Sequence, residues 1–149
     1  MHIDDVLSGC ATNLYALHML KSKGLNQELI NRGFTATILA KLLYSAQFWW
    51  GFTNSTDKIR LEAFLRKATK CNFYSGTAKF SELVDKADDR LFKSIINNPH
   101  HPISQLLPPS KNEIIHRLRP RPHNYELPFK INSIVEKNFT FRMLYRNSY

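Results

Sequence analysis

Apolar residues recur at intervals of three and four along the first part of the chain, which is the spacing of one face of an α-helix. The first such stripe comprises Ile3, Val6, Leu7, Cys10, Leu14, Leu17 and Leu20. Lys21 and Lys23 then give a basic last turn, and Gly24 is typical of a residue that follows a helix end. The pattern therefore predicts a helix over residues 3–23.

Two further helices are predicted from the same periodicity. Apolar residues four apart indicate a second helix from about Asn26 to Phe48. Gly51 interrupts that pattern, after which Asn54 or Ser55 offers a side-chain cap for a third helix over about residues 56–70. The residues that we expect this third helix to bury are Leu61, Phe64, Leu65 and Ala68.

A change of composition near residue 98 marks a predicted domain boundary. Ser81 and Glu82 open a helical pattern over about residues 80–98, and Pro99 ends it. All seven prolines lie between Pro99 and Pro128, and they favour extended or turn conformations. We therefore predict a helical domain over residues 1–98 and a Pro/Arg-rich extended tail over residues 99–149.

The last part of the chain shows a period of two. The alternating residues are Phe129, Ile131, Ser133 and Val135, and then Phe139, Phe141, Met143 and Tyr145. A short break over residues 136–138 separates the two runs, which predicts a β-hairpin. The predicted fold class is thus mainly α: a bundle of three to five helices, an extended segment and a short C-terminal hairpin.

Composition narrows the class of protein. Of the 149 residues 43% are hydrophobic and 12% aromatic, which supplies a core and excludes disorder along the whole chain. The uncharged apolar stretch Leu42–Thr56, with 15 residues, is shorter than the roughly 20 residues of a membrane span. Two acidic residues near the start differ from a secretory signal, so we expect an intracellular protein, cytoplasmic or nuclear, without a membrane partner. Cys10 and Cys71 are expected to be reduced, packed thiols.

The net charge of +9 rises along the chain, from +1 over residues 1–54 to +3 over residues 55–110 and +5 over residues 111–149. Such a gradient favours contact between nucleic acid and the C-terminal part, because Lys and Arg that neutralise phosphates release counterions. The alternative interpretation is that the charge serves solubility alone.

Candidate catalytic motifs are weak. Asp88-Asp89, within KADDR, resembles the paired aspartates of a template-directed polymerase. Such a site needs strand-borne carboxylates and a third acid around two Mg²⁺ ions, whereas this pair lies in a helical pattern. The pair His100-His101 lacks further ligands at metal-binding spacing. We expect no catalytic residue, metal or cofactor in this chain.

The segment RLRPRP presents Arg117, Arg119 and Arg121 from an extended backbone, a form in which guanidinium groups can pair with phosphates. Tyr125 and Phe129 nearby are candidates for stacking on bases. The alternative is a surface strap whose arginines pair with acidic residues. The aromatic cluster over residues 44–52 is interpreted as the core of a helix end rather than as a stacking platform.

Several strings together resemble a known family. AKLLYSAQFWWGF, RLEAFLRKATKCNFY, FSELVDKADDRLFKSIINNPHHPISQLLPP and RLRPRPHNYELP are similar to the C-terminal part of reverse transcriptases from non-LTR retrotransposons, close to the jockey-like group. The resemblance implies that residues 3–23 are the helix that leaves the palm, that residues 25–70 are the helical thumb which grips the template-primer duplex, and that the remainder is a C-terminal extension. The family's catalytic aspartates precede this region, so the resemblance implies no polymerase activity for this chain alone.

Two hypotheses about function follow. In the first, the chain is a fragment of an RNA-directed DNA polymerase that contributes sequence-nonspecific binding of RNA, DNA or an RNA–DNA hybrid. The predicted phosphate contacts are Arg60, Arg66, Lys67, Lys70, Arg117, Arg119 and Arg121. In the second, the chain is a structural or protein-interaction fragment that binds a partner or a second copy through exposed helix faces around residues 44–52.

Overall fold

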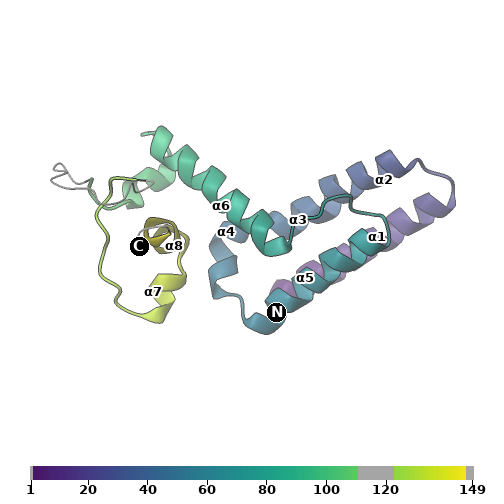
Figure 1. Cartoon of the computed structure of the whole chain (residues 1–149), viewed down its shortest axis with the longest axis horizontal. Coiled ribbons are helices and arrows are strands. Elements are labelled where there is room, and N and C mark those ends of the chain that lie inside the picture. Colours follow the sequence, from purple (N-terminus) through teal and green to yellow (C-terminus); the bar gives the residue numbers. More distant parts are fainter. Residues whose placement is uncertain (1, 111–122, 147–149) are drawn as a thin grey trace. The chain divides into compact units, whose positions relative to one another are not determined.

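The computed structural model of the chain describes residues 2–110 and 123–146 (Figure 1). Contacts divide the chain into two compact units. The first unit comprises Met1–Ala46 and Thr53–Asp85, and the second comprises Gln47–Phe52 and Lys86–Tyr149. The division falls within a helix at residue 85, which differs from the boundary predicted near residue 98. Each unit is described by itself.

The first unit is built from three lengths of helix. They are α1 (His2–Ser22), a continuous stretch made of α2 (Gln27–Gly33), the π-helix η1 (Phe34–Leu39) and α3 (Ala40–Leu43), and α5 (Ser55–Lys70). Lys21 of α1 donates a hydrogen bond to the Cys71 carbonyl at 3.1 Å, just after α5 ends, so α1 and α5 run in the same direction. The middle stretch runs back along α1, with Cys10 opposite Ile38. Residues from all three lengths form the core: Ile3, Cys10, Leu17, Ile30, Phe34, Ile38, Leu39, Leu42, Leu61, Leu65 and Ala68.

The helices at 3–23 and 56–70 are confirmed with their predicted ends. Gly24 follows α1 with a φ of 88°, a conformation that glycine adopts without steric cost. Asn54 caps α5, because its side chain accepts a hydrogen bond from the Asp57 N–H at 2.7 Å. Leu61, Leu65 and Ala68 are buried as predicted, whereas Phe64 is only partly buried.

The second predicted helix, from about Asn26 to Phe48, is wrong beyond residue 43. Tyr44 leaves the helical conformation with a ψ of 120°, and Ser45 takes a φ of 52°. The helix therefore ends before α4 (Ala46–Trp49) and the 3-10 helix η2 (Trp50–Phe52) begin. Ala46 and Trp50 are nevertheless buried. The helical spacing of apolar residues continues across residues 44 and 45, so the sequence pattern did not indicate that the helix ends there.

The two thiols differ in access, and this difference gives a testable expectation. Cys10 is fully buried as expected, whereas Cys71 is exposed, so the expectation of a packed thiol is wrong for Cys71. Burial raises the pKa of the Cys10 thiol, so its reactive thiolate is disfavoured. We expect a thiol-reactive chromophore to label one cysteine in the folded chain and two in denaturant. Rapid labelling of both thiols in the folded chain would contradict the burial of Cys10. Rapid labelling of a folded Cys71→Ser variant, in which only Cys10 remains, would contradict it as well.

The second unit is centred on α8 (Phe139–Tyr145) and the C-terminal half of α6 (Phe80–Asn97). Its core comprises Phe92, Ile95, Phe139, Met143 and Leu144, with Ile103, Leu107, Tyr125 and Leu127 packed against it. Part of the Pro-rich region thus packs on α6, including the 3-10 helix η3 (Pro102–Leu106) and an isolated β-bridge between Ser110 and Tyr125. This shared core explains why the unit begins inside α6. The Pro/Arg segment over residues 117–122 lies outside the described residues.

The predicted C-terminal hairpin is wrong, because residues 133–145 form α7 (Ser133–Lys137) and α8. Asn132 caps α7 by accepting from the Val135 N–H at 2.8 Å, and Asn138 caps α8 by accepting from the Thr140 N–H at 3.2 Å. The apolar residues at alternate positions are also four apart, and α8 buries Phe139 and Met143 on that helical spacing. The expected mainly α fold is confirmed, and within the described part of the chain no helix is long and apolar enough to span a bilayer.

Candidate nucleic-acid interface

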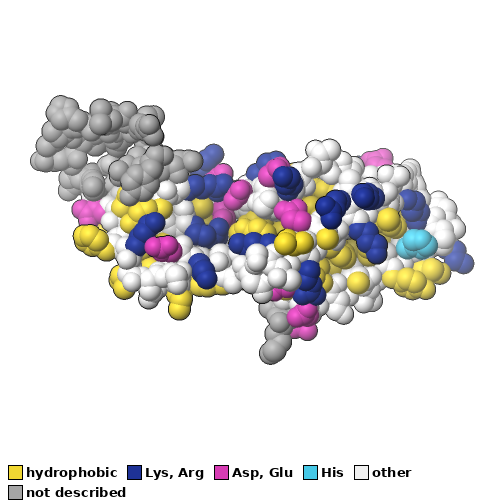
Figure 2. Space-filling view, turned by 60° about the horizontal axis from the view of Figure 1, so that its bottom comes forward, with side chains coloured by type: hydrophobic (Ala, Val, Ile, Leu, Met, Phe, Trp, Pro, Cys, Tyr) yellow, Lys and Arg dark blue, Asp and Glu magenta, His cyan; other side chains and the backbone are white. Residues whose placement is uncertain are grey.

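Four of the seven predicted phosphate contacts lie on α5, and the other three, Arg117, Arg119 and Arg121, fall outside the described residues. Figure 2 shows Lys and Arg side chains spread over the face that it presents, some beside acidic side chains and several close to one another. The four residues on α5 therefore differ in their surroundings, and each is considered by what its charge contacts.

Arg60 is engaged within the protein. Its guanidinium pairs with Asp4 of α1 and with Asp57 of α5, both at 2.8 Å. The hydrogen bond from Arg60 lowers the pKa of the Asp4 carboxyl, so this pairing is present above the ordinary carboxyl pKa and is lost as the pH falls through the lowered value. Two carboxylates balance the charge of Arg60, which makes it the weakest of the four as a phosphate ligand.

Arg66 and Lys70 face a common cavity. They stand four residues apart, one above the other on the helix surface. The cavity has a volume of about 660 Å³ and lies between α5 and the segment over residues 76–81. The lining consists of Glu62, Leu65, Arg66, Thr69, Lys70, Gly76, Thr77, Ala78, Lys79 and Ser81. Lys67 is exposed on α5 but is not part of this lining.

The wall opposite α5 is held by a single carboxylate. Glu62 accepts hydrogen bonds from the backbone N–H groups of Phe80 and Ser81, each at 2.9 Å. A carboxylate at this place satisfies N–H groups that the first turn of α6 leaves unpaired and interacts favourably with the helix dipole. Phe80 itself is fully buried and anchors the start of α6.

Tyr74 supports the other end of the same wall. Its ring lies 5.6 Å from that of buried Phe34, and it fills the place that a side chain at Gly76 would take. A side chain at position 76 would therefore displace the Tyr74 ring. The segment over residues 76–81 is therefore fixed at both ends, which preorganises the cavity.

The charge of the cavity is positive. Arg66, Lys70 and Lys79 line it, and the negative charge of Glu62 is directed at the start of α6. Hydroxyl groups of Thr69, Thr77 and Ser81 add neutral polar groups to the lining. Clustered cations with hydroxyls suit the oxygens of a phosphate group. Lys79 and Glu62 were missed by the sequence reasoning, because the contact between residues 62 and 80 joins positions 18 apart.

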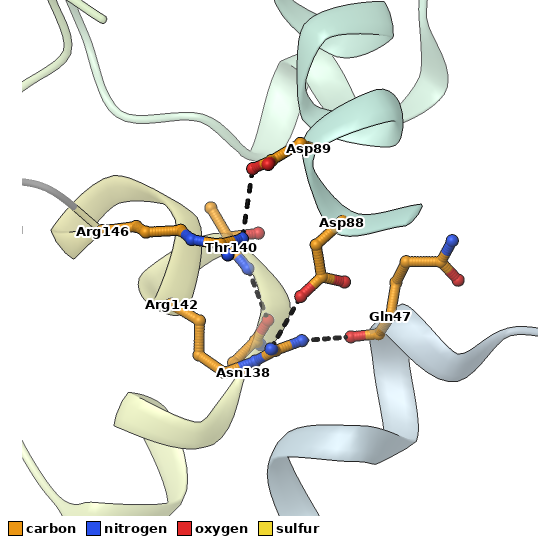
Figure 3. A network of polar contacts seen from close by, with 7 residues as sticks. All are labelled: Gln47, Asp88, Asp89, Asn138, Thr140, Arg142 and Arg146. Carbon is orange, nitrogen blue, oxygen red and sulfur yellow. Dashed lines mark hydrogen bonds and ion pairs between the residues drawn. The ribbon is translucent and has the colours of Figure 1, made fainter. Parts of the chain in front are cut away.

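The paired aspartates serve structure in the second unit (Figure 3). Asp88 is fully buried, and the Arg142 guanidinium donates to it at 2.8 Å and to the Gln47 carbonyl at 2.8 Å. Asp89 pairs with Arg146 at 3.1 Å. The two carboxylates thus contact different arginines. Over residues 2–110 and 123–146 no group of three or more His, Cys, Asp or Glu side chains is placed to hold a metal ion.

The aromatic residues that were candidates for stacking on bases differ in their exposure. Tyr125 packs against the core of the second unit, whereas Phe129 is 93% exposed. In the cluster at residues 44–52, Trp50 is buried and Phe48 lies 5.9 Å from Phe139, ring centre to ring centre. Tyr44, Phe48 and Phe52 are exposed, so the interpretation of this cluster as the core of a helix end is wrong for these three residues.

Comparisons with known proteins add no relative: no family model, no curated protein and no solved structure matches this chain.

Proposed function

We propose that the chain binds the phosphate backbone of RNA or DNA through α5 and the segment that faces it. The observation that carries this proposal is the cationic cavity, in which Arg66 and Lys70 of α5 are joined by Lys79. Exposed Lys67 extends the charge beyond the cavity. Backbone contacts of this kind carry no sequence information, so the binding is sequence-tolerant.

This role agrees with the resemblance of residues 25–70 to the thumb of non-LTR retrotransposon reverse transcriptases. In that setting the chain would contact a template-primer duplex, including an RNA–DNA hybrid, and would act in the cytoplasm or nucleus. The proposal is one of binding rather than catalysis. The buried ion pair of Asp88 with Arg142 supports it, since that carboxylate stabilises the fold of the second unit.

The test is a fluorescence-polarisation titration of the full chain with labelled single-stranded RNA, duplex DNA and an RNA–DNA hybrid at several salt concentrations. We expect the logarithm of the affinity to fall linearly with the logarithm of the salt concentration. Replacing Arg66 and Lys70 by Gln is expected to lower the affinity about tenfold and to reduce the slope on duplex DNA by about 2, because two cationic phosphate ligands are removed.

A matched control is the double variant Lys23→Gln/Lys93→Gln, which removes the same charge at exposed positions outside the cavity. This control is expected to bind nearly as the unchanged chain does. Equal losses of affinity in the two double variants would show that net charge alone produces the binding. No binding by a chain whose helical circular dichroism is intact would refute the proposed function.

A protein-interaction role is the second candidate. Phe48 and Phe52 of the second unit are each 50% exposed, and exposed apolar side chains that lie together can mark a protein-interaction surface. If this role is correct, sedimentation equilibrium will show self-association or capture of a defined partner, and Phe52→Ser will weaken it without changing nucleic-acid binding. A chain that stays monomeric at all concentrations and binds nucleic acid would exclude self-association.

A further inference from the structure

We propose that the cavity between α5 and residues 76–81 holds one unstacked nucleotide of a single strand, with the phosphate at Arg66, Lys70 and Lys79 and the base against the apolar interior. This inference rests on the proposed function and deepens it. Backbone binding alone requires only an exposed cationic surface, whereas this site is hollow.

The size and chemistry of the cavity suit a single nucleotide. Its volume of about 660 Å³ lies within the range of roughly 300–1,000 Å³ that small-molecule sites occupy. Leu65, which is 2% exposed, and half-buried Ala78 and Gly76 give it an apolar part. A free phosphate would leave that apolar part empty, but a nucleotide would cover it with the face of its base.

The cations are placed on both walls. Arg66 and Lys70 come from successive turns of α5, and Lys79 comes from the opposite segment. The Arg guanidinium can pair with two phosphate oxygens at once, and the lysines add point charges beside it. Glu62 fixes the start of α6 through the backbone of Phe80 and Ser81, and Lys79 immediately precedes these residues on the opposite wall.

Strand preference distinguishes this site from simple backbone binding. A base can enter a cavity only when it is unstacked and unpaired, as in single strands, loops and ends. Electrostatic attraction alone favours the duplex, since the salt dependence per phosphate is steeper for duplex than for single strands. A preference for single strands therefore indicates occupation of the cavity.

The experiment compares a short labelled single strand with the blunt duplex of the same sequence, using polarisation and the full chain at one salt concentration. We expect the single strand to bind about fivefold more tightly than the duplex, which corresponds to a difference of about 1 kcal/mol in binding free energy. AMP is added as a competitor, with adenosine beside it. Competition by AMP but not by adenosine indicates that a free nucleotide also enters, whereas no competition together with a strand preference assigns the site to the strand alone.

Two variants test the cavity itself. Lys79→Glu reverses the charge at its rim, and Thr77→Trp fills it from an exposed position without changing the charge. Each is expected to abolish the preference for the single strand, and Thr77→Trp tests this without removing any of the cations that line the cavity. Lys23→Glu, with the same charge change outside the cavity, is expected to keep the preference.

The outcomes separate the two proposals. Equal affinity for single strand and duplex, or the same preference in Thr77→Trp as in the unchanged chain, overturns the nucleotide site and leaves backbone binding standing. Failure to bind either nucleic acid overturns the proposed function and this inference with it.

Discussion

Replacing Arg142 with methionine is expected to lower the free energy of unfolding by about 3–5 kcal/mol, the cost of leaving one member of a buried ion pair uncompensated. Asp88 has no solvent exposure, and Arg142 donates to its carboxylate and to the Gln47 carbonyl, each at 2.8 Å. Methionine retains much of the apolar stem and removes the charge and the donors. Urea denaturation followed by circular dichroism measures the change.

Two further variants show whether burial of the pair causes the effect. The double variant Asp88→Leu/Arg142→Met removes both charges, so we expect it to recover most of the stability, because an apolar replacement of a buried pair is often neutral. Arg146→Met breaks the more exposed pair with Asp89 and is expected to cost at most about 1 kcal/mol. A destabilisation by Arg142→Met no larger than that by Arg146→Met would contradict a stabilising role of the Asp88 pair.

The sequence predicted well those elements whose stability is local. The helices α1, α5 and α6 combine an apolar period with residues that cap or end them, and the structure confirms all three. The sequence-based prediction failed where the same residues fit both the period of a strand and the period of a helix. Phe139 and Met143 are consistent both with alternate positions on a strand and with a helical step of four, and only the caps Asn132 and Asn138 favour the helices.

The candidate site was predicted only in part, because local sequence patterns identify residues on one helix but not the residues that tertiary structure brings beside it. Arg66 and Lys70 could be chosen from charge and helical spacing alone, whereas the wall that completes the cavity comes from residues brought back by tertiary structure. The burial of Asp88 had a visible signal, because it stands four residues from both Val84 and Phe92 in the buried stripe of α6. Its partner Arg142 lies 54 positions away, beyond the reach of any local pattern.

The second large effect is expected at Glu62. Replacing it with alanine is expected to destabilise the first unit by about 2–3 kcal/mol, since a hydrogen bond to a charged group contributes about 1.5–3 kcal/mol and a helix N-cap about 0.5–2 kcal/mol. The backbone N–H groups of Phe80 and Ser81 lose their acceptor, and Phe80 is fully buried beside them. The matched control is Glu82→Ala, an exposed acid in the same first turn of α6, with an expected cost below about 1 kcal/mol.

The same pair of variants also distinguishes charge from geometry in the cavity. Each adds one positive charge to the chain, so long-range attraction for nucleic acid rises equally in both. Only Glu62→Ala releases the wall that carries Lys79, and we therefore expect it to lose the preference for single strands while Glu82→Ala retains that preference. If both variants kept the preference and both were equally stable, the carboxylate of Glu62 would not be holding the start of α6. The cavity would then be formed by the packing of Phe80 and Tyr74 alone.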